Sequence, residues 1–426
     1  MSKPDTKILN KTIEHMNVSL ARVAPAMLEN GEGYRLQIEH IYKPLLEAFE
    51  TGKPVVYMNF SMNSELFTAM DMVPIIIDGL ALELSRGEGG RGALEFIDIA
   101  ERYTSAHLCS DNKTTLGAAL SGAMPAPSII VHGSAPCDSA IASYPAMADF
   151  YDVPYFCVEY PYFKDERGYN YMSDEFKRLV SALEKVTGRK MDLDKLKEVM
   201  KYSNTTREYW LKIRELRRTV PCPVGSLDVI VDAGIMGHLG GTSFAADYMR
   251  KRYELLKDRV DKGVGHLKEE KYRLVWPYGW AVFEPTLISW LEQKYGAITV
   301  ATMFGNSQAQ PFEDISDYDK IVMSLAKTYV NLPMLKEVYA SWEAFVDTAI
   351  DMYNYFKADV AIFGGHVACK SNWAIMKLIK DKIQETTGMP LLILEWDDFD
   401  PRIMSADQVR AKIDEYFETV VPTPKK

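Results

Sequence analysis

The chain has 426 residues, 47% hydrophobic and 25% charged, and a formal net charge of −10. These are the values of a globular protein that is long enough for two or three domains. The negative charge, with no Lys/Arg-rich run interleaved with aromatic residues, argues against nucleic-acid binding. It does not exclude a local basic pocket for an anionic ligand.

Nothing in the sequence predicts a signal peptide or a membrane span. The first residues, MSKPDTKILNKTIEHMN, are polar and lack an apolar run. The most apolar stretch, MVPIIIDGLALEL, is interrupted by Pro74, Asp78 and Gly79. The five scattered cysteines form no recognisable disulfide framework. We therefore expect a cytoplasmic protein.

The first half of the chain alternates between helices and strands. Apolar residues recur at helical spacing from 7 to 50, and Gly52 ends that segment. Short apolar runs then predict strands at 53–60, 74–79, 127–134 and 155–163, with a short helix over 63–72. This alternation is typical of a parallel sheet covered on both faces.

The second half begins with charged helices and then alternates again. Helices are predicted over 174–188, 193–218 and 242–260. A second set of strands and an amphipathic closing helix follow, at 271–280, 297–303, 358–367, 390–397 and 405–420.

The sequence thus predicts an α/β fold with two parallel-sheet lobes of Rossmann-like or flavodoxin-like type. An N-terminal helical segment and a helical insert accompany them. The expected divisions are 1–52 (helical segment), 53–164 (first lobe), 165–268 (helical region) and 269–426 (second lobe). Ligands of such folds bind outside the carboxyl ends of the strands, so the cleft between the lobes is the expected site.

Three of the five cysteines are candidate metal ligands. The sequence has no P-loop, no dinucleotide-binding GxGxxG in a strand–turn–helix context, no HExxH and no CxxC. Cys109, Cys137 and Cys369 lie at predicted strand ends or at loop-to-helix junctions, whereas Cys157 lies within a strand and Cys222 between two prolines. Buried inert thiols and ligands of an iron–sulfur cluster both remain open for the first three. The last two are interpreted as bystanders.

Several polar residues near these cysteines admit two interpretations. His132 and His366 are either structural histidines or donors to a cluster sulfur. Lys370 is either a surface residue or a charge that stabilises a reduced cluster. Glu65, at the start of the helix after the first strand, is either a general acid/base or a complement to the helix dipole.

A second acidic candidate lies near the C-terminus. Asp397, Asp398 and Asp400 follow a predicted strand and could bind a hard cation. The favoured interpretation is structural: Asp400 pairs with Arg402, and Ser405 caps the last helix.

Taken together and in order, the motifs resemble one family. The chain is similar to the catalytic subunits of 2-hydroxyacyl-CoA dehydratases and ATP-dependent benzoyl-CoA reductases, from about Pro54 to the C-terminus. The stretches that carry the resemblance are NSELFTAMDMVP, HLCSDNKTTLG, MPAPSIIV, DVPYFCVEYPY, KYRLVWPYGW, ACKSNW and EWDDFDPRIMSADQVR.

The resemblance implies a cofactor, partners and a reaction. Cys109, Cys137 and Cys369 match the three cysteines that hold a [4Fe–4S] cluster with one open iron. Members pair with a homologous second subunit and receive a low-potential electron from a separate ATP-hydrolysing iron–sulfur activator. The substrate is an acyl-CoA thioester, which is dehydrated through a ketyl radical or, in the other branch, reduced at its aromatic ring. Glu65 matches a family glutamate, here without the preceding proline.

Two further functions remain open from the sequence. The chain could be a non-catalytic subunit that supports a sister chain or relays electrons. It could also be a two-lobed binding protein without a metal, in which case the three cysteines would lie far apart. The sequence does not identify the acyl group.

Overall fold

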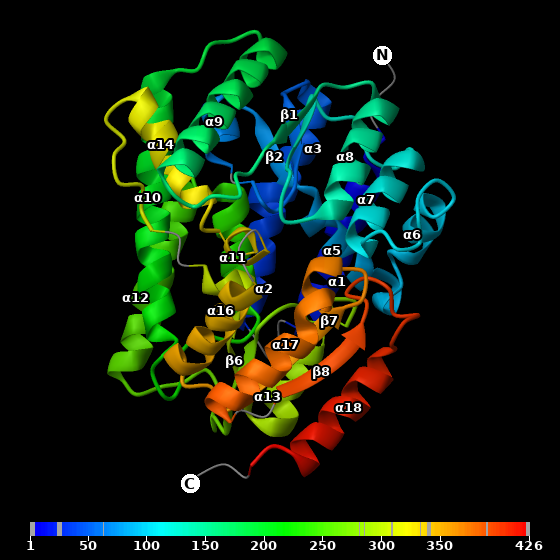
Figure 1. Cartoon of the computed structure of the whole chain (residues 1–426), viewed down its shortest axis with the longest axis vertical. Coiled ribbons are helices and arrows are strands. Elements are labelled where there is room, and N and C mark those ends of the chain that lie inside the picture. Colours follow the sequence, from blue (N-terminus) through cyan, green and yellow to red (C-terminus); the bar gives the residue numbers. More distant parts are fainter. Residues whose placement is uncertain are drawn as a thin grey trace.

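The computed structural model describes residues 5–23, 28–62, 64–280, 282–284, 286–307, 310–332, 334–338, 342–388 and 391–422. Two four-stranded parallel sheets lie one above the other along the long axis of the molecule, each covered by helices (Figure 1). None of the helices in these ranges is both long enough and apolar enough to cross a membrane.

The first sheet has the strand order β2-β1-β3-β4. All three pairings are parallel, and Val56 of β1 lies between Pro74 of β2 and Ile129 of β3. The central strands are buried apolar runs, as expected for a sheet covered on both faces. The strands are β1 (Val55–Met58), β2 (Val73–Ile76), β3 (Ile129–Gly133) and β4 (Tyr155–Val158).

The second sheet repeats this topology with the order β6-β5-β7-β8. In both sheets the first strand in the chain lies between the second and the third, so strand order reverses there, and ligands of such folds bind at that reversal. The predicted fold of two parallel-sheet lobes is confirmed. The strands are β5 (Tyr272–Trp276), β6 (Ala297–Thr302), β7 (Val360–His366) and β8 (Leu391–Trp396).

Two layers of helices enclose the first sheet. One face packs against the N-terminal helices and those between β2 and β4; the other packs against α4, α9, the first half of α10, and α14. The bounds are α1 (Lys7–Val23), α2 (Leu28–Gln37), the π-helical η1 (Ile38–Tyr42), α3 (Lys43–Thr51), α4 (Glu65–Ala69), α5 (Ile77–Gly90), α6 (Leu94–Ala100), α7 (Ser110–Leu120), α8 (Asp138–Tyr151), α9 (Glu166–Thr187), α10 (Leu193–Leu216) and α14 (Tyr318–Tyr329).

The second sheet is enclosed in the same way. The second half of α10 packs on one face with α11, α12, α16 and α17, while α13 and α18 pack on the other. The bounds are α11 (Asp228–Leu239), α12 (Ser243–Asp261), α13 (Leu287–Tyr295), the 3-10 turn η2 (Phe304–Asn306), α15 (Leu335–Val338), α16 (Trp342–Tyr355), α17 (Lys370–Thr387) and α18 (Ala406–Thr419).

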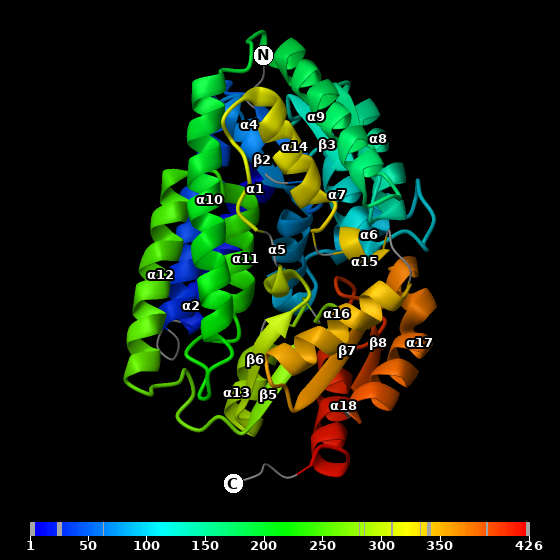
Figure 2. The same ribbon diagram turned by 60° about the vertical axis from the view of Figure 1, so that its left-hand side comes forward.

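Two helices join the lobes. Helix α10 runs beside both of them (Figure 2), with Leu196 in the core of the first lobe and Trp210 in the core of the second. Helix α14 follows β6 of the second sheet in the chain, yet it packs on the first lobe, where the rings of Tyr329 and Phe176 are 4.8 Å apart. The division of the chain into four regions stays a prediction.

The predicted strands are all present, with differences at their ends. Strand β2 ends at Ile76 rather than at 79 because buried residues then recur at helical spacing along α5. Strand β4 ends at Val158, and the backbone N–H of Tyr160 donates to the Ser134 hydroxyl instead of to a strand. Residues 63 and 390, which were included in a predicted helix and a predicted strand, lie outside the described residues.

Candidate functional site

The three candidate cysteines occupy the same kind of position on three helices. Cys109, Cys137 and Cys369 are the N-cap residues of α7, α8 and α17, and none of their side chains accepts a capping hydrogen bond. The sulfur atoms are therefore free for another role. The partial positive charge of a helix N-terminus favours a thiolate there.

Two of these positions are equivalent in the two lobes. Cys137 follows β3 and Cys369 follows β7, which are the third strands of sheets with the same order. Lys370, next to Cys369, forms an ion pair of 2.7 Å with Asp138, next to Cys137. The carboxyl ends of the two sheets thus meet at these cysteines, and the lysine that was a candidate for cluster stabilisation pairs across the lobes.

The three thiols influence one another electrostatically. Burial raises the pKa of Cys109 well above its usual range, and the charges of Asp111, Cys137 and Cys369 raise it further. Burial also raises the pKa of Cys137, with the next contribution from Cys369. Three thiolates at this place would therefore need a compensating positive charge.

The chain provides hydrogen-bond donors to two of the sulfurs. His366 Nε2 lies 3.1 Å from Cys109 Sγ, and His366 Nδ1 accepts from the backbone N–H of Asp398 at 3.1 Å. A neutral imidazole with Nδ1 as acceptor carries its proton on Nε2, so His366 donates to the sulfur. Asn372 Nδ2 donates to Cys369 Sγ at 3.2 Å. The interpretation of His366 as a donor to one of the cysteine sulfurs agrees with its contact to Cys109.

The other histidine candidate makes its hydrogen bonds within the first sheet. His132 contacts the Tyr155 hydroxyl through Nε2 and the Gly133 carbonyl through Nδ1. Burial lowers its pKa to about 4, which is the behaviour of a neutral structural histidine.

The acidic run after β8 is tied into the protein, as its structural interpretation predicts. Asp400 forms an ion pair of 2.6 Å with Arg402, and Ser405 forms a capping box with Gln408 at the start of α18. Asp397 accepts from the Ser110 hydroxyl at 2.6 Å, which fixes this loop of the second lobe beside Cys109. Asp398 accepts from the Trp396 indole at 2.6 Å, and burial raises its pKa to about 7.

Two carboxyl groups near the cysteines, the buried Asp78 and the half-buried Asp111, were not predicted. Asp78 accepts from the backbone N–H of Phe60 at 2.7 Å, and burial raises its pKa to about 6. Burial and the charge of Asp78 raise the pKa of Asp111 well above its usual range. Asp78 and Asp111 are 33 positions apart, so their proximity has no local signal in the sequence.

The remaining candidates lie elsewhere. Glu65, the first residue of α4, is buried against α10, where it accepts from Ser203 at 2.7 Å and pairs with Arg207 at 3.1 Å. Cys157 is on β4, and Cys222 is buried with its sulfur 3.5 Å from the Val224 carbonyl. Cys109, Cys137 and Cys369 thus lie within electrostatic range of one another, whereas Glu65 lies against α10.

The geometry bears on the kind of metal site that these thiols could form. In the part of the chain that the structure describes, no three His, Cys, Asp or Glu side chains are grouped as ligands of a single ion. Cys109, Cys137 and Cys369 are therefore not arranged as ligands of one ion.

Comparison with known proteins gives a consistent match over most of the chain. A family model described as 2-hydroxyglutaryl-CoA dehydratase, D-component, matches residues 59–420. The (R)-2-hydroxyisocaproyl-CoA dehydratase alpha subunit of Clostridioides difficile is 23% identical, over 89% of this chain and 93% of its own length. The (R)-phenyllactyl-CoA dehydratase alpha subunit of Clostridium sporogenes is 22% identical, over 88% and 92%. A benzoyl-CoA reductase subunit of Thauera aromatica is 24% identical, over 89% and 91%.

Proposed function

Because the chain belongs to the 2-hydroxyglutaryl-CoA dehydratase D-component family, we propose that it is the cluster-carrying subunit of a radical enzyme that acts on acyl-CoA thioesters. The favoured reaction is the dehydration of a 2-hydroxyacyl-CoA through a ketyl radical of the thioester. The named relatives are subunits of enzymes, and two of the three just described are 2-hydroxyacyl-CoA dehydratase alpha subunits.

The observation that supports this proposal is that three cysteines are N-cap residues whose side chains take no part in capping, and that they lie within electrostatic range of one another. Cys109, Cys137 and Cys369 would hold a [4Fe–4S] cluster, which when bound supplies one-electron chemistry and an iron position without a protein ligand. The residues around them fit that group, because three helix N-termini and the donors His366 and Asn372 favour negatively charged sulfur.

Hydrogen bonds within the chain hold the cysteine side chains and the two lobes in position. His366 and Asn372 hold the sulfurs of Cys109 and Cys369 in place, and the Ser110–Asp397 hydrogen bond holds the second lobe against α7. Positioning of this kind keeps reacting groups aligned without reorganisation during the reaction.

Two partners belong to the proposal. A homologous second subunit would complete the enzyme, since the relatives are themselves named as single subunits of larger enzymes. A separate ATP-hydrolysing iron–sulfur protein would deliver the electron, and the lack of a P-loop in this sequence agrees with ATP being handled elsewhere. We place the enzyme in the cytoplasm.

A second candidate function is reduction of the aromatic ring of benzoyl-CoA. The similarity to the benzoyl-CoA reductase of Thauera aromatica, which is as high as to the dehydratase subunits, favours it specifically. A supporting or electron-relay role for this subunit is the third possibility.

Turnover by the anaerobically purified complex, co-expressed from neighbouring genes, tests the proposal. We expect the complex to consume a 2-hydroxyacyl-CoA and not benzoyl-CoA, and Cys137→Ala to abolish turnover while Cys157→Ala leaves it unchanged. Consumption of benzoyl-CoA alone would establish the second candidate. Full turnover by the Cys137→Ala complex would reject a catalytic cluster on this subunit.

A further inference from the structure

The C-terminal part of α10 carries two buried arginines without a carboxylate partner. Arg214 Nε donates to Asn306 Oδ1 at 3.0 Å, and Arg217 Nη2 donates to the Gly305 carbonyl at 2.6 Å. Arg214 is 8% exposed and Arg217 is 2% exposed. Within the described ranges, no Asp or Glu forms an ion pair with either residue.

Arg217 has more buried N–H groups without a hydrogen-bond acceptor than Arg214 has. Its Nε and Nη1 atoms are buried and have no hydrogen-bond partner within the described chain. Burial and, to a smaller extent, the charge of Arg214 lower its pKa to about 10. An unpaired buried cation is costly to stability, so a negative charge near Arg217 and its neighbour Arg214 would be stabilising.

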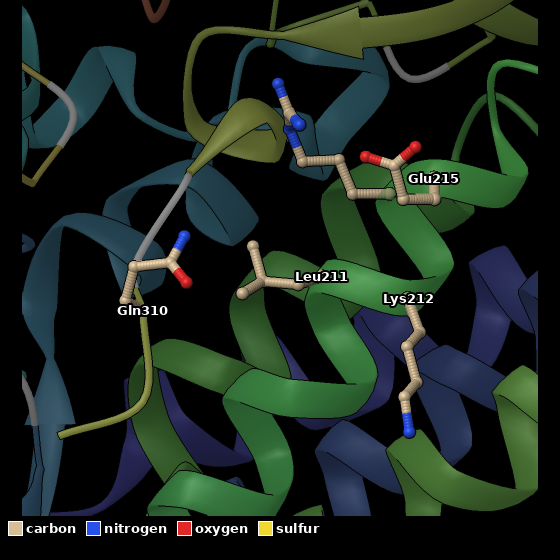
Figure 3. Close-up of a pocket in the computed structure, with 5 residues that line it drawn as sticks. Leu211, Lys212, Glu215 and Gln310 are labelled. Carbon is tan, nitrogen blue, oxygen red and sulfur yellow. The ribbon is translucent and has the colours of Figure 1, made fainter. Parts of the chain in front are cut away.

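A cavity of about 270 Å³ opens beside Arg214. It is lined by Leu211, Lys212, Arg214, Glu215 and Gln310 (Figure 3). The guanidinium of Arg214 lies 3.8 Å from the ring centroid of Tyr355, which fixes its plane at the cavity wall. A planar guanidinium held in this way can bind a phosphate with two parallel hydrogen bonds.

The other charged residues of the cavity are already neutralised. Glu215 pairs with Arg218 at 2.9 Å and accepts from the Tyr355 hydroxyl. Lys212 pairs with Glu208 at 2.7 Å and points away from Gln310 in Figure 3. The uncompensated charge at the cavity is therefore positive and comes from Arg214, with Arg217 one helical turn behind it.

A second cavity, of about 530 Å³, adjoins the first, because Gln310 lines both. Its wall includes Met303 and Ser307, which follow β6, and Thr348. Cys369 follows β7. One strand, β5, separates β7 from β6, so the ends of β6 and β7 are about 10 Å apart. A volume of this size is in the range of small-molecule sites.

We propose that the cavity at Arg214 binds a phosphate group of a phosphorylated ligand, the rest of which extends into the adjoining cavity. The proposal deepens and rests on the proposed function, under which the ligand is an acyl-CoA and the bound group is its 3′-phosphate. Free inorganic phosphate is the other source of the same chemistry.

Equilibrium binding by the anaerobic complex distinguishes these sources. Loss of charge-assisted hydrogen bonds to one phosphate corresponds to roughly ten- to hundredfold in affinity. We expect CoA to bind that much more tightly than dephospho-CoA, which lacks the 3′-phosphate, and Arg214→Gln to remove the difference by weakening CoA alone. Arg250→Gln, which removes an exposed cation that pairs with Asp247 on α12 and lines neither cavity, should bind both ligands as the wild type does.

Each contrary result has a definite meaning. Equal binding of CoA and dephospho-CoA by the wild-type complex overturns the assignment to CoA, and this comparison needs no variant. The phosphate site itself is rejected if, in addition, wild type and Arg214→Gln show the same affinity for inorganic phosphate or neither binds it. Iron content of Arg214→Gln, expected to equal that of wild type, separates this outcome from a failure of the cluster proposal. Arg214→Lys serves if Arg214→Gln does not fold.

Discussion

The sulfur of Cys109 is where contacts from both lobes meet. His366 and Asp397 come from the second lobe, and they contact Cys109 and its neighbour Ser110 at the start of α7 in the first. Proximity in sequence was enough to identify His366 as a neighbour of Cys369. That its ring reaches Cys109, 257 positions away, is set by the packing of the lobes.

The other contacts could be predicted only where the residues that make them are close in the sequence. Ser405 and the Asp400–Arg402 pair were predictable because a cap and a pair two residues apart are local features. Asp78 and Asp111 were not, since nothing local in the chain places these two carboxyl groups together. Glu65 was placed correctly at a helix start, but the sequence does not reveal that α10 covers it.

The environment of Glu65 leads to a prediction that separates a structural from a catalytic role. Glu65 and Arg207 are both almost fully buried and pair at 3.1 Å, so removing one leaves an uncompensated charge. We expect Glu65→Ala to lower the free energy of unfolding by about 3–5 kcal/mol. We expect Glu65→Leu combined with Arg207→Leu to lower it by less than either single change. Urea unfolding measures both.

The catalytic interpretation of Glu65 predicts a different result. Glu65→Gln keeps the shape of the side chain and an acceptor for Ser203. If this variant is folded but inactive, Glu65 takes part in the reaction. If its turnover per folded molecule equals that of wild type, Glu65 is structural.

At the scale of elements, the strands were predictable and the packing of the helices was not. Buried apolar runs such as those of β1 and β3 are short and bounded by turn residues, which is a local pattern. Helix α14 has an apolar face like any amphipathic helix, and no local feature indicates that this face covers the first sheet rather than the second.

Helix α7 holds Cys109 in place through a close approach to α6. A Cβ atom added at Gly117 would overlap the carbonyl of Phe96, whereas one added at Gly79 on α5 meets only the His238 ring at 3.5 Å. We expect Gly117→Ala to lower the free energy of unfolding by about 1–3 kcal/mol and to reduce iron retention by shifting α7. Gly79→Ala is the control.

Iron content after anaerobic dialysis and urea unfolding check this prediction. The Gly79→Ala variant should match wild type in both, or be slightly more stable because alanine favours helix. A Gly117→Ala variant with unchanged stability would contradict the close packing of α6 on α7.

At the scale of the molecule, the two lobes share helices in their hydrophobic cores, so we do not expect them to fold as independent domains. Helix α10 contributes to both cores, and α14 returns from the second half of the chain to the first lobe. Fragment 1–268 lacks α14 and would expose the apolar surface around Phe176 that α14 covers. We expect this fragment alone to bind a hydrophobic dye, and to lose that binding when fragment 269–426 is co-expressed. A fragment 1–268 that unfolds cooperatively and binds no dye would contradict shared cores.

The central claim is that Cys109, Cys137 and Cys369 together hold one iron–sulfur cluster at the seam between the lobes. Iron and acid-labile sulfide in the anaerobically purified complex test it most directly. The triple variant Cys109→Ala, Cys137→Ala, Cys369→Ala is compared with the double variant Cys157→Ala, Cys222→Ala. We predict that the triple variant has about four fewer iron atoms per chain than wild type, while the double variant keeps the wild-type amount. Equal iron in the triple variant and the wild type, or no iron in this wild-type subunit, would contradict the account.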